Sequence, residues 1–136
     1  MHHPVDPGLY YEDQKPEALR RADAFRTARL PKFLTHFEAV LRANHTGAGV
    51  LVGTAVSTAD LALYHVLHGL THAYPRRVGA LRAAGAHPKV FALKDKLDRE
   101  LAAYLASDRR CEYSKGVFRH YPELVSPRSP LSEPAR

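Results

Sequence analysis

The feature that most constrains this chain is a helix start in mid-sequence, where residues 56–61 read Val-Ser-Thr-Ala-Asp-Leu. The Ser57 hydroxyl can accept a hydrogen bond from the Asp60 amide, and the Asp60 carboxylate can accept one from the Ser57 amide. Val56 and Leu61 flank this cap and can pack together as a hydrophobic staple. A helix needs such a reciprocal cap most where water cannot reach its first amides. The motif therefore predicts a buried helix start, with Ser57 and Asp60 in structural rather than catalytic roles.

The apolar spacing on both sides of this motif predicts an all-α chain. An apolar stripe with three- and four-residue steps covers residues 11–44. Its members are Leu19, Ala22, Phe25, Leu30, Phe33, Leu34, Phe37 and Leu41. Pro31 lies inside this stripe and predicts a kink or break near residues 28–30, because proline lacks a backbone donor and clashes with the preceding turn.

The remaining apolar runs predict further helices with short links. Residues 58–73 are apolar almost all round, which predicts a helix buried on most sides. A short helix is expected at residues 76–84 and another from residue 87 through residue 97, and residues 101–105 either continue that helix or form a further one. Residues 50–53 form an apolar connector that could be a strand, although nothing else in the sequence resembles a partner strand for it.

Composition restricts the class of protein and its partners. The 136 residues suit one domain, and the single cysteine, Cys111, cannot form an internal disulfide. No apolar run approaches the roughly 18 residues of a membrane span, and no signal peptide is recognisable, so we expect a cytoplasmic protein without a membrane partner. The net charge is +6, but basic residues are mixed with acids, as in residues 94–100. We therefore expect no nucleic-acid partner; a basic field that concentrates small anions is the alternative.

The capped helix start resembles the capping box and staple of the glutathione S-transferases, where it opens the central helix of the C-terminal, all-α domain. Further segments are similar to that domain in the family's order. They are residues 30–41, 74–77, 87–90, 103–107 and 118–124, the last being similar to the tail of sigma-like members. The resemblance, to sigma- and alpha-like domains, covers roughly residues 10–124.

This resemblance implies an all-α, orthogonal helical bundle of the glutathione S-transferase C-terminal type. The implied boundaries are a lead-in loop at residues 1–10 (the end of a truncated first helix), the helical domain at 11–124 and a disordered tail at 125–136. The family's thioredoxin-like domain, which carries most of the glutathione site and the residue that activates the thiol, has no counterpart in this sequence.

For function, the resemblance implies a transferase-like protein whose parent activity is detoxifying conjugation of glutathione, as co-substrate, to electrophiles. We expect this chain alone to bind no cofactor, to hold no catalytic residue and to lack catalytic competence. Expected partners are a thioredoxin-like domain and a second copy in a homodimer, because the uncovered apolar face favours self-association. The alternative function is a non-enzymatic scaffold of the kind found in translation factors and synthetase complexes.

Several side chains are candidates for binding or chemistry. Tyr10, Tyr11 and Phe118 are expected to contact the electrophilic substrate. The five tyrosines considered as hydroxyl donors to a thiol are interpreted as packing residues. They are Tyr10, Tyr11, Tyr64, Tyr104 and Tyr113.

Histidines and the cysteine could support other chemistry. His65, His68 and His72 share one helix face, and imidazoles at this spacing can bind Zn²⁺ or Ni²⁺. No carboxylate lies within the run to complete the set, so we expect no metal site and interpret these residues as a polar strip that faces a ligand or the missing domain. Cys111 follows two arginines that would lower a thiol pKa, but it has no adjacent histidine and is interpreted as a free thiol.

Overall fold

A computed structural model describes residues 4–113, 116–118 and 120–125 of the chain. These residues form helices and turns and no strand, which confirms the all-α prediction. After a 3₁₀ turn at Glu12–Gln14, the helices are α1 (Lys15–Ala24), α2 (Leu30–Ala43), α3 (Thr58–Ala73), α4 (Pro75–Ala83), α5 (Pro88–Glu100), α6 (Ala102–Leu105) and α7 (Pro122–Val125). None of the helices in the described ranges is both long and apolar enough to cross a membrane.

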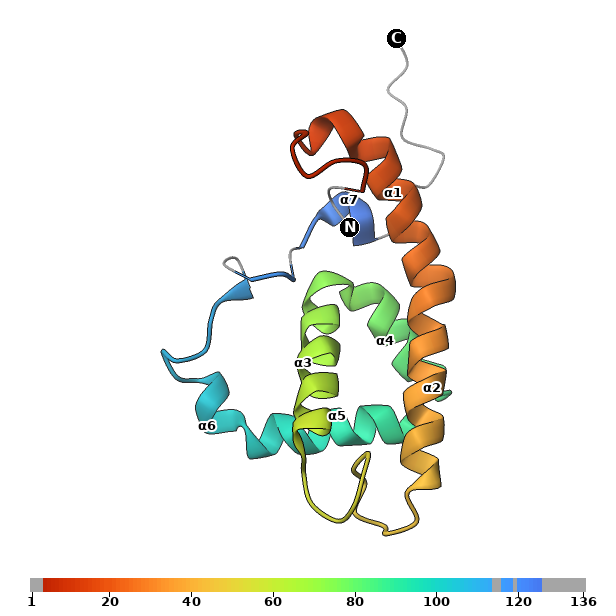
Figure 1. Ribbon diagram of the computed structural model, residues 1–136, viewed down its shortest axis with the longest axis vertical. Coiled ribbons are helices and arrows are strands. Elements are labelled where there is room, and N and C mark those ends of the chain that lie inside the picture. The colour runs from red at the N-terminus through yellow and green to blue at the C-terminus, as the bar shows by residue number, and fades with distance from the viewer. Residues whose placement is uncertain (1–3, 114–115, 119, 126–136) are drawn as a thin grey trace.

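The kink or break expected near residues 28–30 takes the form of a π-helical turn, and the helix continues through it. Residues Phe25–Arg29 form this turn, which joins α1 to α2 in one continuous column (Figure 1). The Leu30 amide bonds to the Phe25 carbonyl, five residues back instead of four. We attribute the turn to Pro31, because widening the helix by one residue makes room for a ring that donates no hydrogen bond.

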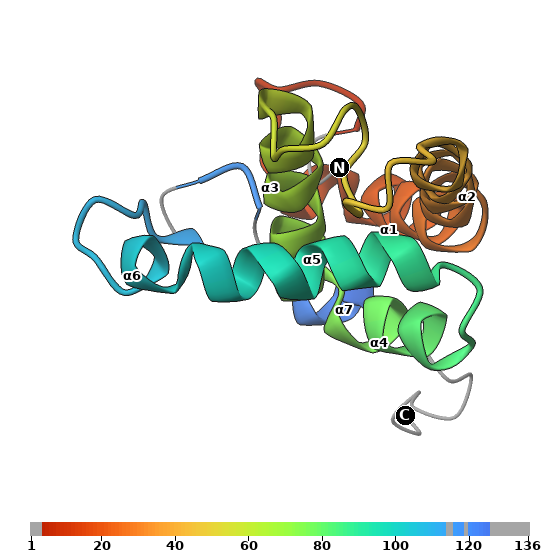
Figure 2. The ribbon, with the colours of Figure 1, turned by 90° about the horizontal axis from the view of Figure 1, so that it is seen from below.

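The main core lies where α5 crosses behind α2 and α3. Figures 1 and 2 show α5 running across both helices, and it packs against each of them. The largest fully buried apolar side chains are Leu41, Val50, Val90, Leu93 and Leu97. The Val50 to Gly53 connector contains bends instead of a strand, and the Asn44 side-chain amide donates to the carbonyls of Val50 and Gly53 at 2.8 and 2.9 Å.

A second, smaller core joins the two ends of the described chain. Helix α7 packs on α1, and Leu124 lies buried against Ala18 and Ala22. Residues 4–11 form turns without helix, and Val125, which the sequence assigns to the tail, closes α7 and is buried. The predicted disordered tail otherwise falls on residues 126–136, outside the described ranges.

Helix α3 is less covered than its apolar sequence predicts. Leu61 is 40% exposed and Val66 is 45% exposed, so the prediction of burial on most sides is wrong. Val66 follows Leu61 by five residues, about 140° around a helix, so the two side chains lie on different sides of α3. Helix α3 therefore has two exposed apolar side chains on different sides, and Leu61 lies on the side that faces α6.

Candidate functional site

The start of α3 is fixed as the sequence predicts. The reciprocal capping box of Ser57 and Asp60 is present, and Asp60 is fully buried. Its carboxylate accepts from the Ser57 amide at 2.8 Å, the Ser57 hydroxyl at 2.6 Å and the Leu51 amide at 2.7 Å. Burial acts to raise the pKa of Asp60, but these hydrogen bonds outweigh it and hold the pKa below its ordinary value. Asp60 thus anchors the preceding loop as well as the helix.

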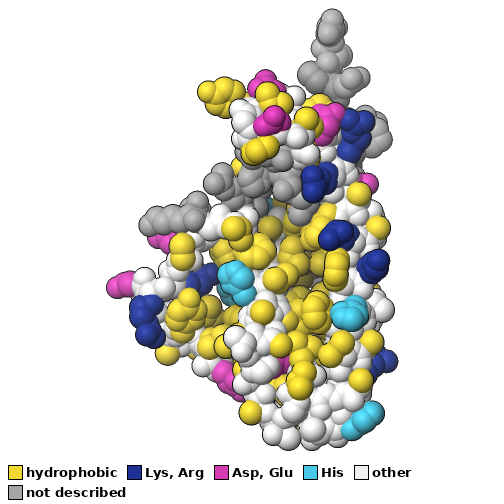
Figure 3. Space-filling view, in the orientation of Figure 1, with side chains coloured by type: hydrophobic (Ala, Val, Ile, Leu, Met, Phe, Trp, Pro, Cys, Tyr) yellow, Lys and Arg dark blue, Asp and Glu magenta, His cyan; other side chains and the backbone are white. Residues whose placement is uncertain are grey.

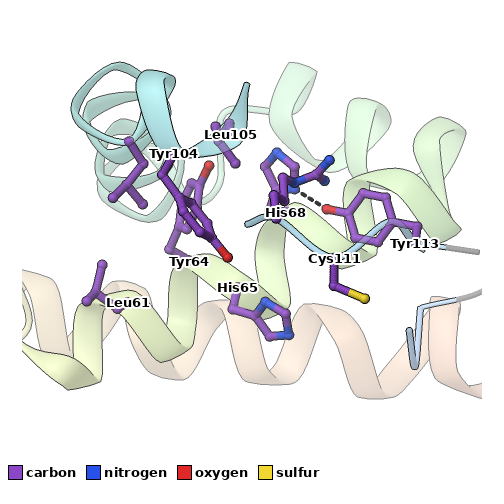
Figure 4. A pocket seen from close by; sticks show the side chains of 10 residues that line it. Leu61, Tyr64, His65, His68, Tyr104, Leu105, Cys111 and Tyr113 are labelled. Atoms are coloured by element: carbon purple, nitrogen blue, oxygen red, sulfur yellow. Dashed lines mark hydrogen bonds between the residues drawn. The ribbon is translucent and has the colours of Figure 1, made fainter. Parts of the chain in front are cut away.

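A pocket of about 400 Å³ opens beside α3, on the side of Leu61 (Figure 4). We call it the α3 pocket. Its walls come from α3, the end of α5, α6 and the following loop. They are Leu61, Tyr64, His65, His68, Leu101, Tyr104, Leu105, Arg110, Cys111 and Tyr113. Aromatic and aliphatic side chains with a few polar groups, in a space of this size, are typical of a small-molecule site.

The Tyr64 hydroxyl is a polar group of the α3 pocket, and it is held in place by side chains of α5. The Tyr64 hydroxyl donates to Asp98 at 2.8 Å, and the Lys94 ammonium donates to the same carboxylate at 2.6 Å. Burial, then the Asp98 hydrogen bond and charge, raise the pKa of Tyr64 well above its ordinary value. The Tyr64 hydroxyl therefore stays protonated and committed to Asp98.

The loop side of the α3 pocket is held by His68 and Tyr113, whose side chains hydrogen-bond to one another (Figure 4). The Arg110 guanidinium lies 4.7 Å from the centroid of the Tyr113 ring. Burial raises the pKa of Tyr113 despite Arg110, whereas burial, Lys94 and Arg110 lower the pKa of His68. At neutral pH His68 is therefore uncharged, and Arg110 is the cation of this wall.

The predicted histidine strip is divided by the structure. His65 and His68 line the α3 pocket, whereas the His72 ring stacks on Tyr113 with ring centroids 4.3 Å apart. No group of three or more His, Cys, Asp or Glu residues within the described ranges is placed to hold a metal ion. Two of the three histidines thus line the α3 pocket, and the interpretation that they face a ligand or the missing domain stays a prediction.

Cys111 lines the α3 pocket and is exposed. Its thiol makes a weak hydrogen bond to the Glu112 carbonyl at 3.7 Å. Among the described residues no imidazole hydrogen-bonds to this sulfur, so the pairing that activates a nucleophilic cysteine is not formed.

The residues predicted to bind substrate lie outside the α3 pocket. Tyr10 is 82% exposed, and the Tyr11 hydroxyl donates to Glu123 at 2.9 Å while its ring packs on Tyr121 in the second core. Phe118 packs against helix α3 beside the pocket, and its ring centroid lies 5.3 Å from that of His65. A substrate contact by these three residues stays a prediction. The lining residues Tyr104, Leu105 and Arg110 were not predicted to bind substrate. Tyr104 and Leu105 follow Leu101 by three and four residues, as residues on one helix face do, whereas Arg110 lies in the loop after α6 and has no such signal.

We expect Gly69→Ala to detach the segment around Phe118 from α3. A Cβ at Gly69 would overlap the Phe118 ring, so the substitution should lower the free energy of unfolding by about 1–3 kcal/mol. The control is Gly79→Ala in α4, where a Cβ meets nothing within 4 Å and should stabilise the helix by up to about 1 kcal/mol. Urea unfolding of both variants measures this, and equal effects would contradict the packing of Phe118 on Gly69.

Comparisons with known proteins agree on one family. Residues 1–108 match the family model described as the C-terminal domain of glutathione S-transferase. Glutathione S-transferase P 1 of the toad Bufo bufo is 35% identical over 79 residues, which cover 58% of this chain. The match covers 36% of the toad protein, so this chain corresponds to about a third of its length.

Proposed function

Because the chain belongs to the family of glutathione S-transferase C-terminal domains, we propose that it forms the helical half of a glutathione-conjugating transferase. In this proposal a thioredoxin-like domain binds glutathione and activates its thiol, and this chain holds the electrophilic co-substrate. We place the protein in the cytoplasm, where glutathione thiols stay reduced.

The α3 pocket is the observation that carries this proposal. Its aliphatic and aromatic walls suit the apolar body of an electrophile. The Tyr64 hydroxyl donates to Asp98 and so is not available to a thiol, and the Tyr113 hydroxyl hydrogen-bonds to His68. In this proposal the α3 pocket binds and orients the substrate, and the group that activates the thiol comes from the thioredoxin-like domain.

The chemistry assigned to the assembled site is a nucleophilic substitution. The glutathione thiolate attacks the electrophilic carbon, a carbon–sulfur bond forms, and the leaving group departs with its electron pair. The α3 pocket would contribute by positioning that carbon and by excluding water from it, which favours attack by the thiolate over hydrolysis.

The first test measures binding of a reaction product to the chain itself. We expect dinitrophenyl-glutathione to bind with an affinity that Leu61→Arg lowers about tenfold or more, because Leu61 lines the α3 pocket. The control is Val52→Arg, in a loop outside the pocket, where the side chain is 68% exposed. Equilibrium dialysis gives the three affinities. Equal binding by both variants, or no saturable binding, would argue against the pocket as the substrate site.

The second test supplies the proposed partner. The thioredoxin-like domain of a related transferase is added to the chain, and conjugation of chlorodinitrobenzene is followed by absorbance. Activity that requires both parts and falls in Leu61→Arg supports the transferase. Product binding without restored activity would favour a ligand-binding role. Capture of a protein partner independent of glutathione, with no product binding, would favour the scaffold function.

A further inference from the structure

A further pocket, of about 240 Å³, lies where α1 and the π turn meet α4, beside the end of α7. Helix α7 packs against both α1 and α4, and Figure 2 shows its ribbon next to α4. We call this cavity the arginine pocket, because three arginines line it. The lining residues are Asp23, Arg26, Thr27, Arg76, Arg77, Ala80 and Val125.

The charges in the lining of the arginine pocket do not balance. The lining contains three guanidinium groups and one carboxylate, that of Asp23, which leaves an excess of two positive charges. On the face of the molecule that Figure 3 shows, by contrast, Lys and Arg side chains are spread along the right-hand edge. Guanidinium groups gathered around one cavity favour a ligand with more than one negative charge.

Arg26 is the buried member of this set, with 5% of its surface exposed. Its guanidinium donates to the Leu124 carbonyl and, at 3.1 Å, to the Asp23 carboxylate. These two acceptors fix the position of the guanidinium and keep its charge at the pocket. Asp23 is thereby paired with Arg26, and no carboxylate of the lining offsets the charge of the α4 arginines.

The side chain of Arg77 is oriented to bind an anion. Its Nε donates to the Arg26 carbonyl at 2.9 Å, which fixes the plane of the guanidinium group. Among the described residues, its two terminal nitrogens have no hydrogen-bond partner. A guanidinium fork matches two oxygens of a phosphate group. A phosphate on this fork would lie at the first turn of α4, which has no side-chain cap and whose dipole also favours an anion.

We propose that the arginine pocket binds the dianionic phosphate group of a phosphate monoester. A phosphate monoester carries about two negative charges at neutral pH, which match the excess charge of the lining. Ala80 and Val125 give the pocket an apolar wall for the esterified carbon. The proposal does not depend on the transferase function, because this pocket and the α3 pocket share no lining residue.

Two sources of such a phosphate group fit the position of the arginine pocket. One source is a free phosphorylated small molecule. The other is the chain itself, because Val125 lines the pocket and the next two residues in the sequence are Ser126 and Pro127. Adjacent Cα atoms lie about 3.8 Å apart, so a phosphoserine at position 126 begins beside the pocket. The recognising chemistry is the same for both sources.

The first measurement is calorimetric titration of the full chain with phenyl phosphate. We expect saturable binding that added salt weakens, and an affinity at least about tenfold lower in Arg77→Gln, because a charge-assisted contact is lost. Arg76→Gln, at an exposed position, should also weaken binding, and it carries the test if Arg77→Gln does not fold. The control is Arg99→Gln at the exposed end of α5, which removes the same charge and should bind like the wild type.

A ligand of matched shape tests the charge argument. Phenyl sulfate has one negative charge in place of two, and we expect it to bind at least about fivefold less tightly than phenyl phosphate. Equal affinity for the two ligands, equal losses in the α4 variants and in Arg99→Gln, or the absence of saturable binding would overturn the proposal.

A second arm of the experiment identifies the source of the phosphate. A full chain with phosphoserine incorporated at position 126 is titrated in the same way. If the chain's own phosphate occupies the pocket, the affinity for phenyl phosphate should fall about tenfold or more. The phosphorus resonance of this phosphoserine should then move in Arg77→Gln but not in Arg99→Gln. An unchanged affinity for phenyl phosphate supports the same site with a free phosphate monoester as its ligand.

Discussion

Asp60→Ala is expected to lower the free energy of unfolding by about 3–5 kcal/mol, a large part of the stability of an ordinary domain. Asp60 is fully buried and accepts hydrogen bonds from the Ser57 amide, the Ser57 hydroxyl and the Leu51 amide. Each buried donor left without an acceptor costs about 1–3 kcal/mol, and the losses are not fully additive. Urea unfolding followed by far-UV circular dichroism measures the change.

The same carboxylate gives the unfolding free energy a defined pH dependence. The pKa of Asp60 is lower in the folded chain than its ordinary value of 3.8, so its ionised form stabilises the fold. This contribution is complete above the ordinary pKa and is lost as the pH falls through the folded-state pKa. The wild-type chain should therefore lose more stability than Asp60→Ala as the solution is acidified below pH 3.8.

The control for this prediction is Glu100→Ala, which removes an exposed carboxylate at the end of α5. A surface change of this kind is expected to stay within about 0.5 kcal/mol of the wild-type free energy of unfolding. Equal stability of Asp60→Ala and Glu100→Ala would show that the buried cap does not hold the start of α3.

The sequence predicts the parts of the fold that depend on local contacts. The α3 cap needs residues only three positions apart, so the motif at Ser57 and Asp60 is enough to place it. The apolar stripe of residues 11–44 likewise gives the course of the first long helix. A proline inside a helical stripe predicts a distortion at Pro31 but not its form. A break and a π turn both remove the clash between the proline ring and the preceding turn.

Features that depend on which element lies next to which are not predicted. Leu61 and Val66 both appear as core residues in the sequence, and a periodicity cannot tell which apolar positions a neighbouring helix will cover. For the same reason, the sequence predicts only part of the lining of the α3 pocket. His65 and His68 share a helix face with each other, whereas Tyr104 and Arg110 reach the pocket by the packing of α6 and its loop. Helix α7 has too few residues to show a period.

Glu38 shows how much such a long-range contact contributes. Its position within the amphipathic stripe of α2 gives it no distinctive pattern in the sequence. In the structure it is buried and accepts from the amides of Lys89 and Val90 at 3.0 and 3.1 Å, so a side chain of α2 caps the start of α5. Helix α5 has no capping side chain of its own at His87, and therefore relies on this carboxylate.

Glu38→Ala is therefore expected to lower the free energy of unfolding by about 2–4 kcal/mol, because two amides at the start of α5 lose their acceptor. Glu38→Gln keeps one acceptor oxygen and should lose less. The control is Arg42→Ala, which removes the 60% exposed partner of Glu38 and should cost at most about 0.5 kcal/mol. Hydrogen exchange locates the effect, since Glu38→Ala should speed exchange at Val90 more than at amides in the middle of α3. Uniform acceleration at both places would mean that the substitution loosens the whole core, and the capping role of Glu38 would then be wrong.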